Sequence, residues 1–302
     1  MDNRSLTVFI SVAETLNFSR SADALHMSVS AVSRTISRLE DELGQPLFER
    51  DKRRVVLTAA GVEFRRYARD SVAQWQQVLR KIGSEGELAG EVSLFCSVTA
   101  SYSVLAPILE SFRNTHPAVE IMLHTGDQAD GVGRILDGQD DLAVSGQPEQ
   151  IPARMEFLPL LESPLEFWMP TADCAVRRAV LEARNGNGLA NWQNVPLIVP
   201  ERGVTKEALD RWFVAKGIRP RIYAQVAGHE AIVAMVALGL GVGVAPELVV
   251  EAGAMSSQVE GLGVKEGLPP LTIGLCALGQ RLASPLVRSV WDVAAQTYTR
   301  PV

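Results

Sequence analysis

The 302-residue sequence predicts an α/β protein that begins with an all-α winged helix-turn-helix and continues through a long linker helix into a two-subdomain α/β domain. Three observations support this fold class. The stretch Phe18–Arg54 has the order helix, turn, polar-faced helix and basic hairpin, which suits a helix-turn-helix that lays its second helix in a DNA major groove. Next comes a stretch with apolar residues at alternating spacings of four and three, which is typical of a long helix with an apolar seam. After Val92, short apolar strands alternate with helices, as in an α/β domain.

These patterns divide the chain into three parts. We expect the winged helix-turn-helix domain at residues 1–58, with the motif itself at 18–37. The linker helix and hinge follow at 59–89, and the α/β domain occupies 90–302. A chain of this length exceeds one ordinary core, so a division into several domains is expected.

The spacing of apolar residues defines the first three helices. Residues 3–16 form one helix, and Arg20–Leu25 forms a short second helix that ends at the turn His26-Met27. Ser28 is a suitable N-cap for a third helix that runs to Leu43. The buried side of this third helix is expected to consist of Val29, Val32, Ile36, Leu39 and Leu43.

The other side of the third helix is polar and carries Ser30, Ser33, Arg34, Ser37 and Arg38. Arginine can donate a bidentate pair of hydrogen bonds to guanine, and serine can donate to base edges or phosphate. Arg53 is predicted near the tip of the basic hairpin, where it could enter the minor groove. A solvated helix face and a soluble turn are the ordinary alternatives, but the two signals in this order favour DNA binding.

Thr58 is expected to cap a long helix that runs to Ile82. A heptad-like apolar seam runs along it through Ala68, Val72, Trp75, Leu79 and Ile82. Because this apolar seam directly follows the predicted DNA-binding domain, it favours a helix that dimerises. The alternative is a helix that packs on its own domain. The glycine-containing segment Gly83–Glu91 is interpreted as the hinge into the next domain.

The remainder alternates between strands and helices, which predicts mostly parallel sheets. The expected strands have the sequences VSLFCSV, VEIMLHT, DLAVS, LEFWMP, PLIVP, RIYAQV, VGVAPEL and LTIGLCAL. The expected helices occupy residues 103–114, 129–138, 205–216 and 229–239. Two subdomains fit this number of strands: subdomain I at about 90–162 and 267–302, and subdomain II at about 163–266. The crossovers are placed near Leu160–Pro164 and Glu266–Thr272.

Composition narrows the class of protein. At 47% apolar and 21% charged residues the chain has a globular composition. Its three cysteines, Cys96, Cys174 and Cys276, are far apart and fit a reducing compartment. The N-terminal residues lack the apolar run and cleavage site of a signal peptide. The longest uncharged stretch, Ala231–Pro246, is shorter than the about 20 residues that a membrane span needs. We therefore expect a cytoplasmic protein without membrane contact.

Enzyme signatures are incomplete. His229-Glu230 begins like the zinc motif HExxH, but Val233 stands where the second histidine is required. The glycines of Leu238–Pro246 do not form GxGxxG and follow a helix instead of a strand. No P-loop and no nucleophile elbow is present in the sequence. We expect no catalytic residue, no metal ion and no cofactor; a small-molecule enzyme with a helical appendage is the alternative from another class.

A ligand cleft is better supported, because open α/β sheets bind ligands beyond the carboxyl ends of their strands and beside helix N-termini. Nine residues occupy such places: Ser97, Thr99, Ser101, Thr125, Gly126, Glu201, Arg202, His229 and Glu230. Their hydroxyl and N–H groups could hold a carboxylate, with positive charge supplied by Arg202 or His229. The alternative is ordinary helix capping without any ligand.

At this point the chain resembles the LysR-type transcriptional regulators along its whole length. The resemblance rests on Phe18, Ala22, Ala24 and Leu25, on Ala31–Arg50, on Leu57–Gly61 and on Leu238–Glu247. It implies a winged helix-turn-helix, a linker dimer helix and a periplasmic-binding-protein-like effector domain. It also implies homodimers that pair into homotetramers on double-stranded promoter DNA, with RNA polymerase as a candidate partner. The DNA contacts of the family fall on Ser28, Ser30, Ser33, Arg34, Ser37 and Arg38, with Arg53 in the wing.

Within the family, the stretches Gly90–Leu109, Val119–Asp130 and Ile222–Gly239 are similar to activators of isoleucine–valine biosynthesis. This similarity implies control of the acetohydroxy acid isomeroreductase gene. It also implies that the effector is a small 2-hydroxy-3-oxo acid, namely acetolactate or acetohydroxybutyrate. The alternative within the family is a regulator that responds to a different small anionic metabolite, such as an aromatic acid.

Overall fold

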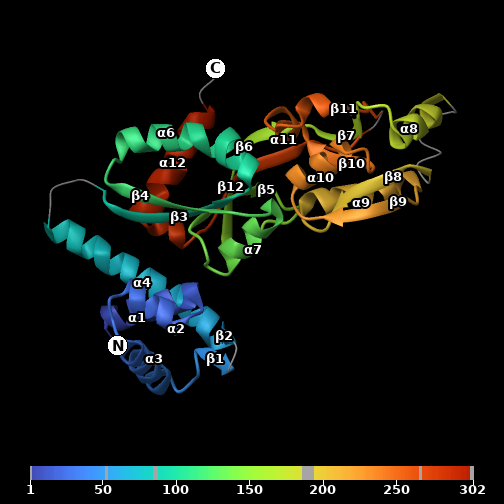
Figure 1. Cartoon of the computed structure of the whole chain (residues 1–302). Helices are drawn as coiled ribbons and strands as arrows, with labels where there is room; N and C mark the ends of the chain where they lie inside the picture. Colours follow the sequence, from blue (N-terminus) through green and yellow to red (C-terminus); the bar gives the residue numbers. More distant parts are fainter. Residues whose placement is uncertain (1, 52–53, 84–87, 186–193, 265–266, 300–302) are drawn as a thin grey trace. The chain divides into compact units, whose positions relative to one another are not determined.

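The structure, a computed structural model, describes residues 2–51, 54–83, 88–185, 194–264 and 267–299 (Figure 1). The chain forms two compact units, Met1–Gly90 and Glu91–Val302. Each unit has its own hydrophobic core, so each is described separately below.

The N-terminal unit is a helix-turn-helix with a two-stranded wing. Its elements are α1 (Asn3–Thr15), α2 (Phe18–Ala24), α3 (Val29–Leu43), β1 (Phe48–Asp51), β2 (Arg54–Leu57) and α4 (Ala59–Gly83). α2 begins two residues before its predicted start, because the Asn17 side chain accepts hydrogen bonds from the N–H groups of Ser19 and Arg20. His26 then adopts a left-handed φ of 51° in the turn that leads to α3.

The core of this unit gathers one face of each helix. Phe9 of α1 and Ile36 of α3 are fully buried, and Phe9 packs edge-on against Phe64 of α4 with ring centroids 4.8 Å apart. The predicted stripe on α3 is correct at Val32, Ile36 and Leu39 but wrong at its two ends. Val29 and Leu43 are 46% and 41% exposed, because the first and last residues of α3 extend beyond the core.

The wing is fixed to the helices at its base. The Glu40 carboxylate accepts hydrogen bonds from the N–H groups of Leu47 and Phe48, at 2.9 and 3.2 Å. Thr58 donates its hydroxyl to the Pro46 carbonyl at 2.7 Å and accepts a bond from the Gly61 N–H at 2.9 Å. Thr58 therefore caps α4, as its position in the sequence predicted.

The predicted seam of α4 divides between two environments. Ala68 is fully buried in the core of its own unit, and Val72 packs against that core. Trp75, one turn further on, is 49% exposed. The side chains of Leu79 and Ile82 lie outside the described residues. The first half of the seam, Ala68 and Val72, thus packs on its own domain, as the alternative interpretation predicted. The second half starts at Trp75, whose indole is exposed instead of packed on this core.

The C-terminal unit contains two five-stranded sheets flanked by helices (Figure 1). The first has the strand order β4-β3-β5-β12-β6 and defines lobe I. Its elements are β3 (Gly90–Cys96), α5 (Val98–Ala100), the π-helix η1 (Ser101–Leu105), α6 (Ala106–Thr115), β4 (Val119–Thr125), η2 (Gln128–Asp130), α7 (Gly131–Leu136), β5 (Leu142–Gly146), β6 (Met155–Ser163), β12 (Leu271–Leu278), η5 (Arg281–Ala283) and α12 (Pro285–Thr299). Helices α6 and α12 cover one face of this sheet and α7 the other.

The second sheet has the order β11-β7-β10-β8-β9 and defines lobe II. Its elements are β7 (Leu165–Pro170), α8 (Ala175–Asn185), β8 (Pro196–Pro200), α9 (Val204–Lys216), β9 (Arg221–Val226), α10 (His229–Ala237), β10 (Val242–Pro246), α11 (Glu247–Glu251), η4 (Ser256–Gln258) and β11 (Val259–Gly261). Alternate residues of β7 face opposite sides: Phe167 packs with α8 and α9, whereas Trp168 packs with α10 and α11.

The prediction of mostly parallel sheets is wrong. β3–β5, β8–β10 and β8–β9 pair in parallel. β12 runs antiparallel to both β5 and β6, and β7 runs antiparallel to both β10 and β11. The reason is the way the chain crosses between the two sheets: β6 continues directly into β7 through Pro164, and β11 leads back to β12. The strands that follow these crossovers, β7 and β12, are the ones that run antiparallel to their neighbours. Both sheets are therefore mixed.

Candidate functional site

The polar face of α3 is accessible in the isolated N-terminal unit. Ser30, Arg34, Ser37 and Arg38 are exposed and Ser33 is half-buried, on the side opposite the buried residues Val32 and Ile36. The Arg34 Nε donates to the Ser30 carbonyl at 3.2 Å, which directs the guanidinium along the first turn of the helix. A helix with two arginines and three serines on its outer face has the donors that major-groove base edges accept.

Ser28 has a structural task as well. Its hydroxyl accepts the Ala31 N–H at 3.2 Å and lies 3.0 Å from the Ser30 hydroxyl. It is therefore the N-cap of α3, and the positive end of the helix dipole lies at these two serines. A helix N-terminus of this kind attracts a phosphate.

The predicted wing is present as an antiparallel hairpin in which Phe48 pairs with Leu57 and Asp51 with Arg54. Arg53, the predicted minor-groove residue, lies outside the described residues together with Lys52. Its contact with DNA therefore stays a prediction.

Some of the candidate effector residues meet between the two lobes of the C-terminal unit. Ser97 follows β3 and caps α5, and the chain continues into the π-helix η1 before α6 begins. Short π-helical stretches are frequent at functional sites. A cavity of about 30 Å³ lies here and is lined by Ser97, Thr99, Ala100, Val104, Gln128, Val144, Ser145, His229, Pro246, Leu248, Val249, Leu271 and Ile273. Three of the nine predicted residues, Ser97, Thr99 and His229, thus line one cavity.

Thr99 and Glu230 join the two lobes. The Glu230 Oε1 accepts hydrogen bonds from the Thr99 hydroxyl at 2.7 Å and from the Thr99 N–H at 3.0 Å. Burial opposes the ionisation of Glu230, but the bonds from Thr99, the bond from its own backbone N–H and the neighbouring His229 together hold the pKa of this carboxyl below its ordinary value. The two donors of Thr99 therefore bind a carboxylate, and that carboxylate belongs to the protein itself.

His229 cannot supply the positive charge that the sequence interpretation assigned to it. Burial lowers the pKa of the imidazole from 6.5 to about 4, so the ring is neutral at physiological pH. Its Nε2 lies 3.1 Å from the hydroxyl of Thr205, which is also buried. The side chain acts as a neutral hydrogen-bonding group.

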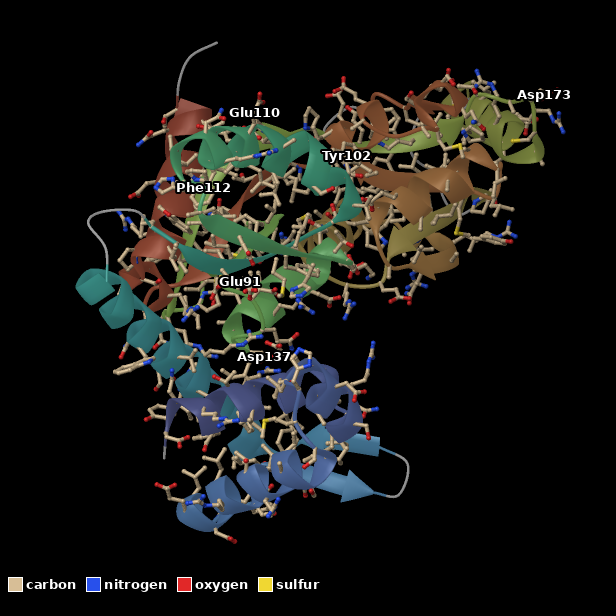
Figure 2. All side chains as sticks on the ribbon, turned by 60° about the vertical axis from the view of Figure 1, so that its left-hand side comes forward. Glu91, Tyr102, Glu110, Phe112, Asp137 and Asp173 are labelled. Carbon is tan, nitrogen blue, oxygen red and sulfur yellow. The ribbon has the colours of Figure 1, made fainter. Side chains whose placement is uncertain are left out.

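Arg202 is engaged by two carboxylates of lobe I. Its Nη2 lies 3.0 Å from Asp130 Oδ1 and 3.6 Å from Asp127 Oδ2. Next to it, a Cβ at Gly203 would lie 2.8 Å from the Ala129 Cβ, so the lobes approach closely at this point. Tyr102, labelled in Figure 2, adds a further link by donating its hydroxyl to the Ala252 carbonyl of lobe II at 3.3 Å.

The remaining four predicted residues lie at the margin. The Ser101 hydroxyl donates to the Val98 carbonyl, which is a local helix contact. Thr125 and Glu201 are exposed at the ends of β4 and β8. The Gly126 N–H donates to the Cys96 carbonyl at 3.0 Å, and a Cβ at Gly126 would touch the Phe95 ring.

Several lining residues were not predicted, among them Gln128, Ser145, Leu248 and Leu271. They come from strand and helix ends that are remote in the sequence and meet only through the topology of the sheets. Among the described residues no cluster of histidine, cysteine, aspartate and glutamate could hold a metal ion. None of the helices in the described ranges is both long and apolar enough to span a membrane.

Comparisons with known proteins agree with this two-part organisation. The family model described as "LysR substrate binding domain" matches residues 85–299, and the one described as "Bacterial regulatory helix-turn-helix protein, lysR family" matches residues 3–62. The chain is 42% identical to the HTH-type transcriptional regulator IlvY of Escherichia coli over 297 residues, which are 97% of this chain and 98% of that one. It is 40% identical to the transcriptional activator IlvY of Haemophilus influenzae, covering 96% and 99% of the two chains.

Solved structures show the same fold. Full-length OxyR from Pseudomonas aeruginosa superposes with a TM-score of 0.68 at 22% identity and covers 99% of this chain and 94% of its own. Full-length CbnR, solved with its target DNA, superposes with a TM-score of 0.61 at 22% identity and covers 98% and 100%.

Proposed function

Because the chain belongs to the LysR family of bacterial helix-turn-helix regulatory proteins, we propose that it activates genes of isoleucine and valine biosynthesis in response to a 2-hydroxy-3-oxo acid. That it is a LysR-type transcriptional activator follows from its near full-length similarity to the IlvY proteins. The target genes and the effectors, acetolactate and acetohydroxybutyrate, are our proposal, and the sequence resemblance to activators of this pathway supports them.

In this proposal α3 enters the major groove of promoter DNA. Arg34 and Arg38 read base edges, and Ser33 and Ser37 contact bases or phosphates. Ser28 and Ser30 lie at the positive end of the helix, where a phosphate is favoured, and Arg53 of the wing reaches the minor groove. The exposure of the polar face of α3 supports this role.

The proposed position of the effector carboxylate rests on one observation, the contact between Thr99 and Glu230. An effector carboxylate would offer the same kind of acceptor to the same two donors, so it would replace the carboxylate of Glu230. His229 is neutral and Ser97 carries a hydroxyl, and both line the same cavity. Groups of this kind suit the hydroxyl and oxo oxygens of the effector.

The present cavity is too small for such a ligand, since about 30 Å³ holds only one or two water molecules. Entry of the effector therefore requires Thr99 and Glu230 to separate. A ligand changes a conformational equilibrium only by binding its two states unequally, and displacement of Glu230 provides that difference. The resulting coupling to transcription would amount to about 1–3 kcal/mol, as in other allosteric proteins.

We propose that the active form is a homodimer or homotetramer in the cytoplasm, and that it contacts RNA polymerase at the promoter. The half-exposed indole of Trp75 on α4 supports a role for this helix in dimerisation, because a large aromatic side chain on a linker helix is suited to a partner surface.

Calorimetric titration of the full-length protein tests the effector assignment. We expect acetolactate and acetohydroxybutyrate to bind in the micromolar to millimolar range and benzoate to give no heat of binding. Binding of benzoate without binding of either 2-hydroxy-3-oxo acid would assign the protein to the alternative, a LysR-type regulator of another small anion.

A further inference from the structure

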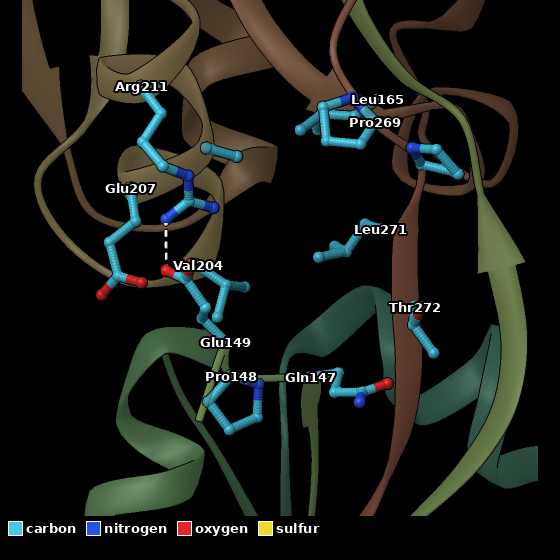
Figure 3. Close-up of a pocket in the computed structure, with 12 residues that line it drawn as sticks. Gln147, Pro148, Glu149, Leu165, Val204, Glu207, Arg211, Pro269, Leu271 and Thr272 are labelled. Atoms are coloured by element: carbon cyan, nitrogen blue, oxygen red, sulfur yellow. Dashed lines mark hydrogen bonds and ion pairs between the residues drawn. The ribbon is translucent and has the colours of Figure 1, made fainter. Parts of the chain in front are cut away.

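A second and larger cavity lies between the lobes, and it is lined by none of the nine predicted effector residues (Figure 3). Its volume is about 330 Å³, within the roughly 300–1,000 Å³ of small-molecule pockets. One wall comes from α9 of lobe II, and the others come from the segment after β5 and from the crossover that leads into β12.

The two sides of this cavity differ in chemistry. Figure 3 shows the side chains of Arg211, Glu207 and Glu149 on one side, and Leu165, Pro269 and Leu271 on the other. Arg211 and Glu207 are one helical turn apart on α9, and Glu149 approaches them from lobe I. The cavity therefore offers one guanidinium, two carboxylates and an apolar wall.

The charged groups are available for exchange. The Arg211 Nη1 lies 2.7 Å from Glu149 Oε2, and these two side chains are 54% and 67% exposed. An ion pair this exposed contributes little to stability, so a ligand that replaces each partner loses little on entering. A ligand that meets both charges would still join the lobes, as the ion pair does.

The charge count selects the class of ligand. Two carboxylates and one guanidinium carry a formal charge of −1, so a simple anion would satisfy Arg211 but leave both glutamates without a cation. A zwitterion satisfies both: its carboxylate pairs with Arg211 and its ammonium with Glu149 and Glu207. The apolar side chain of such a ligand would then face Leu165 and Leu271.

We propose that this cavity binds an α-amino acid with an aliphatic side chain, as a second ligand of the protein. It is separate from the cavity at Thr99. The two cavities share Leu271, and Gly146, between Ser145 of the first and Gln147 of the second, packs so tightly that a Cβ there would lie 2.5 Å from Val204 and 2.9 Å from Leu271. The amino acid bridges the lobes and stabilises their closed arrangement, in which Thr99 holds Glu230, so it opposes the entry of the 2-hydroxy-3-oxo acid.

Three probes that share an isopropyl group test the ligand class in the full-length protein by calorimetry. L-Valine carries both charges, 2-oxoisovalerate lacks the ammonium, and isobutylamine lacks the carboxylate. We expect valine to bind at least about tenfold more tightly than either analogue, since each analogue leaves one charged partner unmatched. Absence of valine binding, or equal binding of the three probes, overturns the proposal.

Variants locate the site. Arg211→Ala and Glu207→Gln should each weaken valine binding by about tenfold. Arg288→Ala removes an exposed arginine of α12 and is the matched control, which should bind valine as the wild type does. Ser97→Ala alters the first cavity without removing the contact between Thr99 and Glu230, so it should weaken acetolactate binding and retain valine binding. Loss of valine binding in Ser97→Ala, without loss in Arg211→Ala, would move the amino acid to the first cavity and overturn the assignment. Circular dichroism confirms that each variant is folded, and Glu207→Gln, which keeps the size of the side chain, is the milder of the two changes.

Failure of this proposal is distinguishable from failure of the proposed function, because it is measured with a different ligand and a different variant. If acetolactate binds and depends on Thr99 but valine does not bind, only the second site is lost. If valine binds and depends on Arg211 but acetolactate does not bind, the second site stands and the effector assignment falls.

Discussion

The carboxylate of Glu230 in lobe II accepts hydrogen bonds from both the N–H and the hydroxyl of Thr99 in lobe I. These residues are 131 positions apart in the sequence, and their contact occupies the donors that an effector carboxylate would use. The protein thus holds an internal acceptor where the proposed ligand binds.

Replacement of this internal carboxylate should make the site easier to enter. Glu230→Gln keeps the shape of the side chain but loses the charge, and neutral hydrogen bonds are weaker than charge-assisted ones. We expect acetolactate to bind about 3- to 10-fold more tightly, which corresponds to about 1 kcal/mol. Calorimetry with wild type and variant measures this, and weaker binding in the variant would mean that Glu230 contacts the effector instead of competing with it.

His229 should make the stability of the effector domain depend on pH. Its pKa is about 4 in the folded state and about 6.5 in the unfolded chain, so between these values only the unfolded state binds the proton. Stability is therefore full above about pH 6.5 and falls as the pH is lowered towards about pH 4, by about 3 kcal/mol in total.

Urea unfolding at several pH values checks this behaviour. His229→Gln removes the titrating ring and should flatten the loss of stability across the same pH range. An equally steep loss in the variant would assign the pH dependence to other groups.

The polar face of α3 should determine DNA affinity. Arg34→Ala or Arg38→Ala should weaken binding to a promoter fragment by about 1–3 kcal/mol for a specific base contact. Fluorescence anisotropy measures the change, and Arg113→Ala, an exposed arginine on α6, is the matched control for loss of one positive charge. Unchanged DNA affinity in both α3 variants would contradict the assignment of this face.

Gly146 should be essential for closure of the lobes. A methyl group there would overlap Val204 and Leu271, and such overpacking typically costs about 1–3 kcal/mol. We expect Gly146→Ala to lower the thermal stability of the protein. Gly133→Ala, in α7 with no neighbouring atom within 4 Å of the added Cβ, should not lower it. Equal stability of the two variants would show that the lobes do not close on Gly146.

Local patterns predicted the elements whose signal lies in neighbouring residues. The apolar stripe through Val32 and Ile36 and the cap at Ser28 correctly predicted α3, since both act within a few turns of helix. Helix α12 was not predicted, although Leu286, Val287, Val290, Trp291 and Ala294 have clear helical spacing and are all buried. Strand β6 was missed because Pro159 and a half-exposed face obscure its alternation.

The site could be predicted only in part for the same reason. Placing Thr99 after a strand and His229 at the start of a helix was sufficient to bring both to one cavity, because ligands of α/β sheets bind beyond the carboxyl ends of strands and beside helix N-termini. The neutrality of His229 depends on burial by residues from both lobes, and the pairing of Arg202 with Asp130 depends on how the lobes meet. Neither is encoded in local spacing.

Transcription from an isoleucine–valine promoter in a purified system tests most directly whether an effector at Thr99 drives activation. We predict that acetolactate stimulates transcription by the wild-type protein, whereas Thr99→Ala binds the same promoter with normal affinity and is not stimulated. Equal stimulation of both proteins, or no stimulation of the wild type, would contradict the account.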